Sequence, residues 1–131
     1  MALGALSLRR LHTCHPDLIG LILQVAKGVD EGDLAYAGVT DITVLCGFRG
    51  EAEQNQAVAD GASKTPWPRS GHNTYPADAV DVAVYPVEWK APDYTRKMDA
   101  LHAYVAGVAH ALGIDLRDIS WDRPHIHRNV P

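Results

Sequence analysis

Apolar residues along this chain recur at two spacings, which divide it into helices and strands. A spacing of three to four residues predicts amphipathic helices over 16–27 and 93–112, and a short polar helix is expected over 51–60. Gly28 and Gly113 follow the two long helices and are expected to end them. The apolar stripe of the first consists of Leu18, Leu21, Ile22 and Val25, and that of the second of Met98, Leu101, Val105, Val108 and Leu112.

Short runs of β-branched and apolar residues predict the strands. Residues 42–46 and 79–85 are the clearest, and 114–120 and 124–128 are expected to be shorter strands. Residues 62–78, with several prolines and glycines, form a long loop, and a loop of that length in a small domain is often functional. The order α-β-α-β-α-β-β predicts an α+β fold in which a small antiparallel sheet is flanked by helices.

Composition and charge narrow the class of protein. A length of 131 residues, 47% of them hydrophobic, predicts a single domain spanning 1–131. The net charge of −4 and the pI near 5.9 give no basic surface for nucleic acid. No apolar run approaches the roughly 20 residues of a membrane span. Cys14 and Cys46 form no paired motif and are expected to be free thiols. Residues 1–10 do not read as a signal peptide, so we expect synthesis in a host cytoplasm.

Asp81 is an acidic residue within an apolar strand. Alternation places it on one face with Ala79 and Ala83, and a carboxylate there needs a partner or a cation. The alternative is an edge strand whose Asp81 faces water. His72 lies in the preceding loop, which can direct its side chain toward that face. Asp78 is the rival carboxylate, but alternation turns it to the other face.

The closing segment, residues 121–127, supplies the remaining donors. Asp122 precedes Pro124, and the extended residues after the proline place His125 and His127 on the same side. Either histidine can therefore reach a metal, and the alternative is that both are solvated near a chain end. Two histidines and one carboxylate, with a second carboxylate nearby, are typical of a catalytic zinc site in which water takes the fourth position. Asp122 would be its general base.

Four segments resemble the zinc peptidases of bacterial cell-wall peptides. These are the D-alanyl-D-alanine carboxypeptidases and dipeptidases, and above all the phage endolysins that act as L-alanyl-D-glutamate endopeptidases. The segments are Cys46-Gly47-Phe48-Arg49 with Glu53-Gln54, Gly61-Ala62-Ser63-Lys64-Thr65, Ser70-Gly71-His72 with Ala79-Val80-Asp81, and Asp122-Arg123-Pro124-His125. They occur in the family's order, and with His15-Pro16-Asp17-Leu18 they cover roughly residues 7–128. The resemblance implies a Hedgehog/DD-peptidase-like single domain.

The resemblance also implies roles for individual residues. It makes His72, Asp81 and His125 the zinc ligands and Asp122 the general base. Arg49 would stabilise the carbonyl oxygen as it gains negative charge, although Arg49 alone would be read as one half of a surface salt bridge. Two further residues, Ser70 and Gln54, match positions that support the site or contact substrate.

The chain departs from the family pattern at two places. The usual gap of six residues between the first histidine and the aspartate is eight here, with the extra residues near Tyr75. The family's Pro-His-aromatic-Glu reads Pro124-His125-Ile126-His127, so His127 replaces a carboxylate and is expected to support the site or to act as an alternative ligand.

The sequence therefore predicts a zinc peptidase that cuts a peptidoglycan stem peptide. We expect a phage-type endopeptidase that acts on the wall after release or is carried in a virion, where phage structural proteins would be partners. The alternatives are a D-Ala-D-Ala carboxypeptidase or dipeptidase, for which Lys64 and Arg69 could bind the terminal carboxylate, and an inactive virion module with the same fold.

Overall fold

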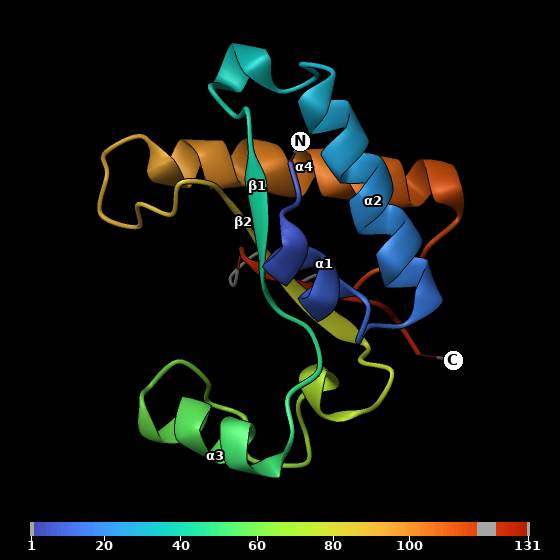
Figure 1. Cartoon of the computed structure of the whole chain (residues 1–131), viewed down its shortest axis with the longest axis vertical. Helices are drawn as coiled ribbons and strands as arrows, with labels where there is room; N and C mark the ends of the chain where they lie inside the picture. The colour runs from blue at the N-terminus through green and yellow to red at the C-terminus, as the bar shows by residue number, and fades with distance from the viewer. Residues whose placement is uncertain (1, 118–122, 131) are drawn as a thin grey trace.

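An antiparallel sheet with the strand order β1-β2-β3 lies at the centre of the structure, a computed structural model that describes residues 2–117 and 123–130 (Figure 1). Its strands are β1 (Ile42–Cys46), β2 (Ala79–Val84) and β3 (His125–His127). The helices are α1 (Ala5–Leu11), α2 (Pro16–Asp30), α3 (Glu51–Ala59) and α4 (Tyr94–Leu112), with short 3₁₀ turns η1 (Ala35–Ala37) and η2 (Gly71–Asn73). The predicted α+β class is therefore confirmed.

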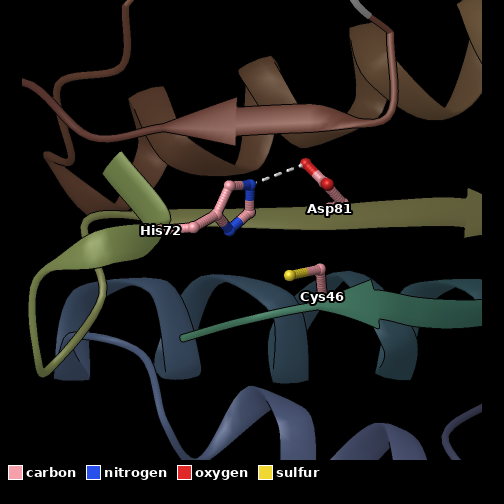
Figure 2. A group of neighbouring side chains, drawn as sticks. All are labelled: Cys46, His72 and Asp81. Atoms are coloured by element: carbon pink, nitrogen blue, oxygen red, sulfur yellow. Dashed lines mark hydrogen bonds and ion pairs between the residues drawn. The ribbon is translucent and has the colours of Figure 1, made fainter. Parts of the chain in front are cut away.

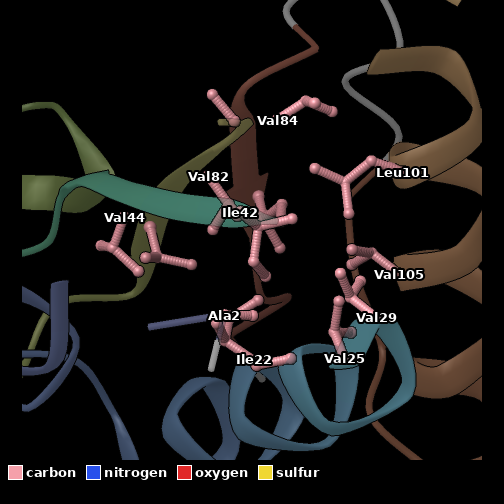
Figure 3. Close-up of a cluster of buried hydrophobic side chains, with 14 of the residues drawn as sticks. Ala2, Ile22, Val25, Val29, Ile42, Val44, Val82, Val84, Leu101 and Val105 are labelled. Atoms are coloured by element: carbon pink, nitrogen blue, oxygen red, sulfur yellow. The ribbon is translucent and has the colours of Figure 1, made fainter. Parts of the chain in front are cut away.

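The hydrophobic core fills the space between the sheet and two long helices. Figure 3 shows side chains of β1 and β2, among them Ile42, Val44 and Val82, which belong to one buried cluster with Val25 of α2 and Leu101 of α4. Burial of these branched side chains is the main favourable contribution to folding. The sheet and the two helices thus form the packed core of the molecule, and the loops extend from it.

The position of β2 decides between the two interpretations of Asp81. β2 pairs with β1 on one side and with β3 on the other, so it is the central strand. Ala79 and Ala83, which share the face of Asp81, are fully buried. The interpretation of Asp81 as a water-facing residue of an edge strand is therefore wrong, and its carboxylate needs partners inside the fold.

The end of α2 differs from the prediction. The helix runs through Gly28 and ends at Asp30, and Tyr104 of α4 packs against Gly28. A methyl group on Gly28 would overlap the hydroxyl of Tyr104, which also donates a hydrogen bond of 2.6 Å to Asp33. The glycine therefore permits a close helix contact and does not end the helix. Gly113, by contrast, follows α4 with a φ of +73° and ends it as predicted.

Two further elements differ from the pattern in the sequence. α1 was not predicted, and it packs against β1, where Ser7 Oγ lies 3.1 Å from Thr43 Oγ1 and accepts from the Val44 amide at 3.0 Å. The strand expected over 114–120 is reduced, within the described residues 114–117, to a single bridge between Leu116 and Arg128. Among the described residues, no helix is long and apolar enough to cross a membrane.

Candidate metal centre

One row of residues crosses all three strands on the same face of the sheet. Cys46 of β1 lies opposite Asp81 of β2, and Asp81 lies opposite His125 of β3. The register of β1 shifts between Val44 and Cys46, so a β-bulge takes up Leu45 and brings Cys46 opposite Asp81. Such bulges often redirect a side chain beside a functional site.

Three donor atoms converge above this row. Nε2 of His72 lies 3.2 Å from Oδ1 of Asp81, and Nδ1 of His125 lies 3.0 Å from the same oxygen. The two imidazole nitrogens are 3.2 Å apart. Ligand atoms held tetrahedrally at about 2.0–2.1 Å from zinc are about 3.3 Å from one another. These three atoms, Nε2 of His72, Oδ1 of Asp81 and Nδ1 of His125, form a triangle. The triangle has the size and the donor types that fit a zinc ion.

Several hydrogen bonds fix the position of His72. It lies in η2, where Ser70 Oγ accepts a hydrogen bond from the His72 amide at 3.2 Å and Asn73 completes a capping box with Ser70. The His72 ring is 1% exposed, and its Nδ1 donates to the carbonyl of Gly47 at 2.7 Å. That bond fixes the orientation of the ring and leaves Nε2 directed at the triangle.

The electrostatics of the triangle favour a bound cation. Burial alone would lower the pKa of His72, but hydrogen bonds with Asp81 and Cys46 outweigh it and raise that pKa to about 10. Burial also opposes the charge on Asp81, yet hydrogen bonds from His125 and His72 hold the pKa of this carboxyl well below its usual range. Asp81 is therefore an anion in a sheltered position, and it requires the positive charge that a proton or a metal ion supplies.

His127 lies on the far side of His125. Its Nδ1 is 3.2 Å from Nε2 of His125, whereas His125 itself contacts Asp81. Burial and the nearby charge of Arg117 lower the pKa of His127 to about 4, so its ring is neutral at pH 7. The ring packs on Gly71, where a Cβ atom would collide with it. The structure thus brings His125, and not His127, to Asp81 and His72.

Cys46 is the residue that the sequence pattern did not identify as part of the site. Its sulfur and donor atoms of His72 and Asp81 all lie within 4.8 Å of one another (Figure 2). The signal in the sequence was the thiol three positions before Arg49, but only the bulge in β1 places it opposite Asp81.

Arg49 lines a pocket of about 430 Å³ beside the triangle. The pocket is also lined by Cys46, Asp81, Phe48 and Glu53. Nε of Arg49 is buried and has no hydrogen-bond partner among the described residues. The Arg49 amide donates to the carbonyl of His72 at 2.7 Å, which ties this cation to the metal triangle. Among the described residues, Arg49 forms no salt bridge.

Gln54 connects the elements around the pocket. It is fully buried on α3, and its Nε2 donates to Ser63 Oγ at 3.1 Å and to the carbonyl of Thr65 at 2.6 Å. Its Oε1 accepts from Asn73 at 3.0 Å. Gln54 therefore holds α3, the long loop and η2 together. This places it with Ser70 among the residues that support the site.

The two other carboxylates considered in the sequence lie elsewhere. Asp78 pairs with Arg128 at 2.8 Å and accepts from Thr74, which leaves it outside the triangle, as alternation predicts. Asp122, the expected general base, is outside the described residues.

The same architecture occurs in a peptidase of known structure. The chain is similar to the crystal structure of the L-Ala D-Glu endopeptidase ChiX of Serratia marcescens, with 27% sequence identity and a TM-score of 0.69. The match covers 97% of this chain and 90% of that one. No family model matches the chain, and no curated protein matches it by sequence. The likeness spans the whole fold and supports hydrolase activity of the peptidase type.

Proposed function

We propose that this protein is a zinc-dependent peptidase that hydrolyses the L-alanyl-D-glutamate bond of peptidoglycan stem peptides. The observation that carries the proposal is the triangle of His72, Asp81 and His125, whose edges of 3.0–3.2 Å suit zinc, in a fold shared with an L-Ala D-Glu endopeptidase. The sequence motifs around Arg49 and Asp122 agree with it.

The chain's own residues can supply the remaining chemistry. When bound, zinc supplies Lewis acidity that polarises the scissile carbonyl and makes water a better nucleophile near neutral pH. Asp122 accepts the proton of the attacking water and returns it to the leaving amine. Arg49, which lines the pocket, stabilises negative charge on the carbonyl oxygen. Phe48 and Glu53 line the same pocket and face the substrate.

Digestion of purified peptidoglycan tests the proposal. Mass spectrometry of the products should show new D-glutamate amino ends and L-alanine carboxyl ends, and the His72→Ala variant should give none. Release of D-alanine alone would identify a D-Ala-D-Ala carboxypeptidase instead. If no new amino or carboxyl ends appear although zinc is bound, peptidase function is contradicted and the inactive module is favoured.

We propose further that the enzyme is of the phage endolysin type. The support is the resemblance of its motifs to that group, which is delivered to the wall at lysis. Bacteria that produce the protein in the cytoplasm should grow normally and lyse when their membrane is permeabilised. Producers of the His72→Ala variant should survive the same treatment, and lysis of both cultures alike would contradict the proposal.

A further inference from the structure

The thiol of Cys46 lies close to two of the three proposed metal ligands, His72 and Asp81. Figure 2 shows its sulfur directed from the end of β1 toward the ring of His72, with Asp81 on the neighbouring strand. The sulfur and the donor atoms of His72 and Asp81 lie within 4.8 Å of one another. Rotation about the Cα–Cβ bond is the one side-chain torsion that moves this sulfur, so few conformations have to be restricted for it to approach the other two donors.

The backbone is arranged to present this thiol. Without the bulge, Leu45 would be the residue opposite Asp81, and the row across the sheet would hold an apolar side chain next to a carboxylate. With the bulge, Cys46 occupies that place and lines the same pocket as Asp81. Its thiol donates only a weak hydrogen bond, 3.5 Å long, to the carbonyl of Gly47.

Cys14, the other cysteine, shows the contrasting behaviour. It is buried, and its thiol faces the carbonyls of Arg10 and Ala79 at 3.9 and 3.8 Å. Burial raises the pKa of Cys14 to about 12, so it stays protonated and does not bind metal. The chain thus carries its own control for experiments on thiols.

We infer that Cys46 is a metal ligand, and that the resting metal centre is formed by Cys46, His72, Asp81 and His125. The inference rests on the metal site of the proposed function and adds a soft donor to it. The sulfur loses its proton to solvent as the sulfur–metal bond forms. Four protein donors give the closed coordination typical of structural zinc, so the thiolate must leave before water and substrate share the ion.

Cobalt(II) titration of the metal-free full-length chain tests the inference. Thiolate ligation gives a sulfur-to-cobalt charge-transfer band in the near ultraviolet, in addition to the weaker visible bands of tetrahedral cobalt. We expect the band in the wild type and in Cys14→Ser, and its loss in Cys46→Ala with the visible bands retained. Visible bands without a charge-transfer band in the wild type would overturn the inference and leave the His and Asp site standing. No cobalt binding at all would instead contradict the metal site of the proposed function.

Alkylation provides a second measurement that needs no variant. Iodoacetamide forms a carbon–sulfur bond with an accessible thiolate and releases iodide. Peptide mapping should find Cys46 labelled in metal-free protein and protected by zinc, with Cys14 unlabelled in both. Equal labelling of Cys46 with and without zinc would contradict ligation.

Discussion

Asp81 and His125 face each other directly across the β2–β3 pair, and Oδ1 of Asp81 lies 3.0 Å from Nδ1 of His125. His72 reaches the same oxygen from a loop, so two fixed strands and one capped turn set the geometry of the triangle. A site built on paired strands is preorganised, because the register of the sheet sets the separation of its donors. The proposed metal binding therefore depends on the central strand as much as on the loop.

The triangle predicts that each of its members is needed for tight metal binding. Asp81 and His72 each contact both other members of the triangle, so Asp81→Ala or His72→Ala disrupts the site even where Cys46 remains, and should lower zinc content far below one ion per chain. Zinc analysis of the purified protein measures this. The matched control is Asp78→Ala, which removes a neighbouring carboxylate that pairs with Arg128. Full zinc occupancy in the double variant of His72 and Asp81 would show that the metal lies elsewhere.

The metal-free protein should show a characteristic dependence of stability on pH. Because the pKa of Asp81 is lower in the folded protein than the ordinary value of 3.8 for an aspartate, the ionised carboxylate stabilises the fold above pH 3.8. This contribution is lost as the pH falls. The raised pKa of His72 stabilises the fold below 6.5, and this contribution is lost as the pH rises toward about 10. Both contributions to stability are therefore present in full between pH 3.8 and pH 6.5.

Thermal unfolding of chelator-treated protein checks this window. The melting temperature should be highest between pH 3.8 and 6.5 and decline on either side. Asp81→Asn should flatten the profile, whereas Asp60→Asn, which alters an exposed residue that bonds Gln56, should not. An Asp81→Asn profile identical to that of the wild type would mean that the His72–Asp81 pair does not control stability.

Much of the fold and of the triangle could be predicted from the sequence, for identifiable reasons. Alternation in 79–85 placed Asp81 on one face, and the spacing of His125 and His127 placed both on another strand's face. These patterns are local, and the structure keeps them. Alternation could not choose between the two histidines, because the choice depends on which one the pairing of β3 with β2 sets opposite Asp81.

The features that were missed depend on contacts between distant segments. Gly28 was expected to end a helix, but its role is set by Tyr104 of α4. Cys46 joins the site only through a bulge, and no signal in 42–46 reveals that one residue will be unpaired. α1 is a short helix whose stability comes from packing on β1, which its own sequence does not show.

Arg49→Lys should reduce turnover more than substrate binding. Lysine keeps the charge but loses the planar guanidinium, and the negative charge on the carbonyl oxygen develops only along the reaction path. Steady-state kinetics on a soluble stem peptide should show a lower kcat with a similar KM. Arg9→Lys, which alters an exposed cation of α1, is the control and should change neither constant. A loss confined to KM would instead make Arg49 an anchor for a substrate carboxylate.

Asp122→Ala should keep the fold and the zinc but lose most of the turnover. A positioned general base typically contributes a factor of ~10²–10⁴ to the rate. Zinc analysis and kcat, measured on the same preparation, separate the two roles of this carboxylate. Near-normal turnover would rule out Asp122 as the base, and loss of zinc would make it a ligand.

The last prediction concerns His127, which contacts the nitrogen of His125 that points away from Asp81. A partner at that nitrogen orients the ligand, and its removal typically costs ~10–100-fold in metal affinity. His127→Ala should therefore weaken zinc binding by about that factor, as measured by competition with a chelating dye. His127→Glu should restore the affinity, because a carboxylate can accept the N–H of His125, and Arg117 is near enough to affect the charge at this position. His125→Ala should abolish binding altogether. A structure with zinc on His127 and His125 turned away would reverse the two roles, and it would also remove the reason for placing Asp122 beside the metal.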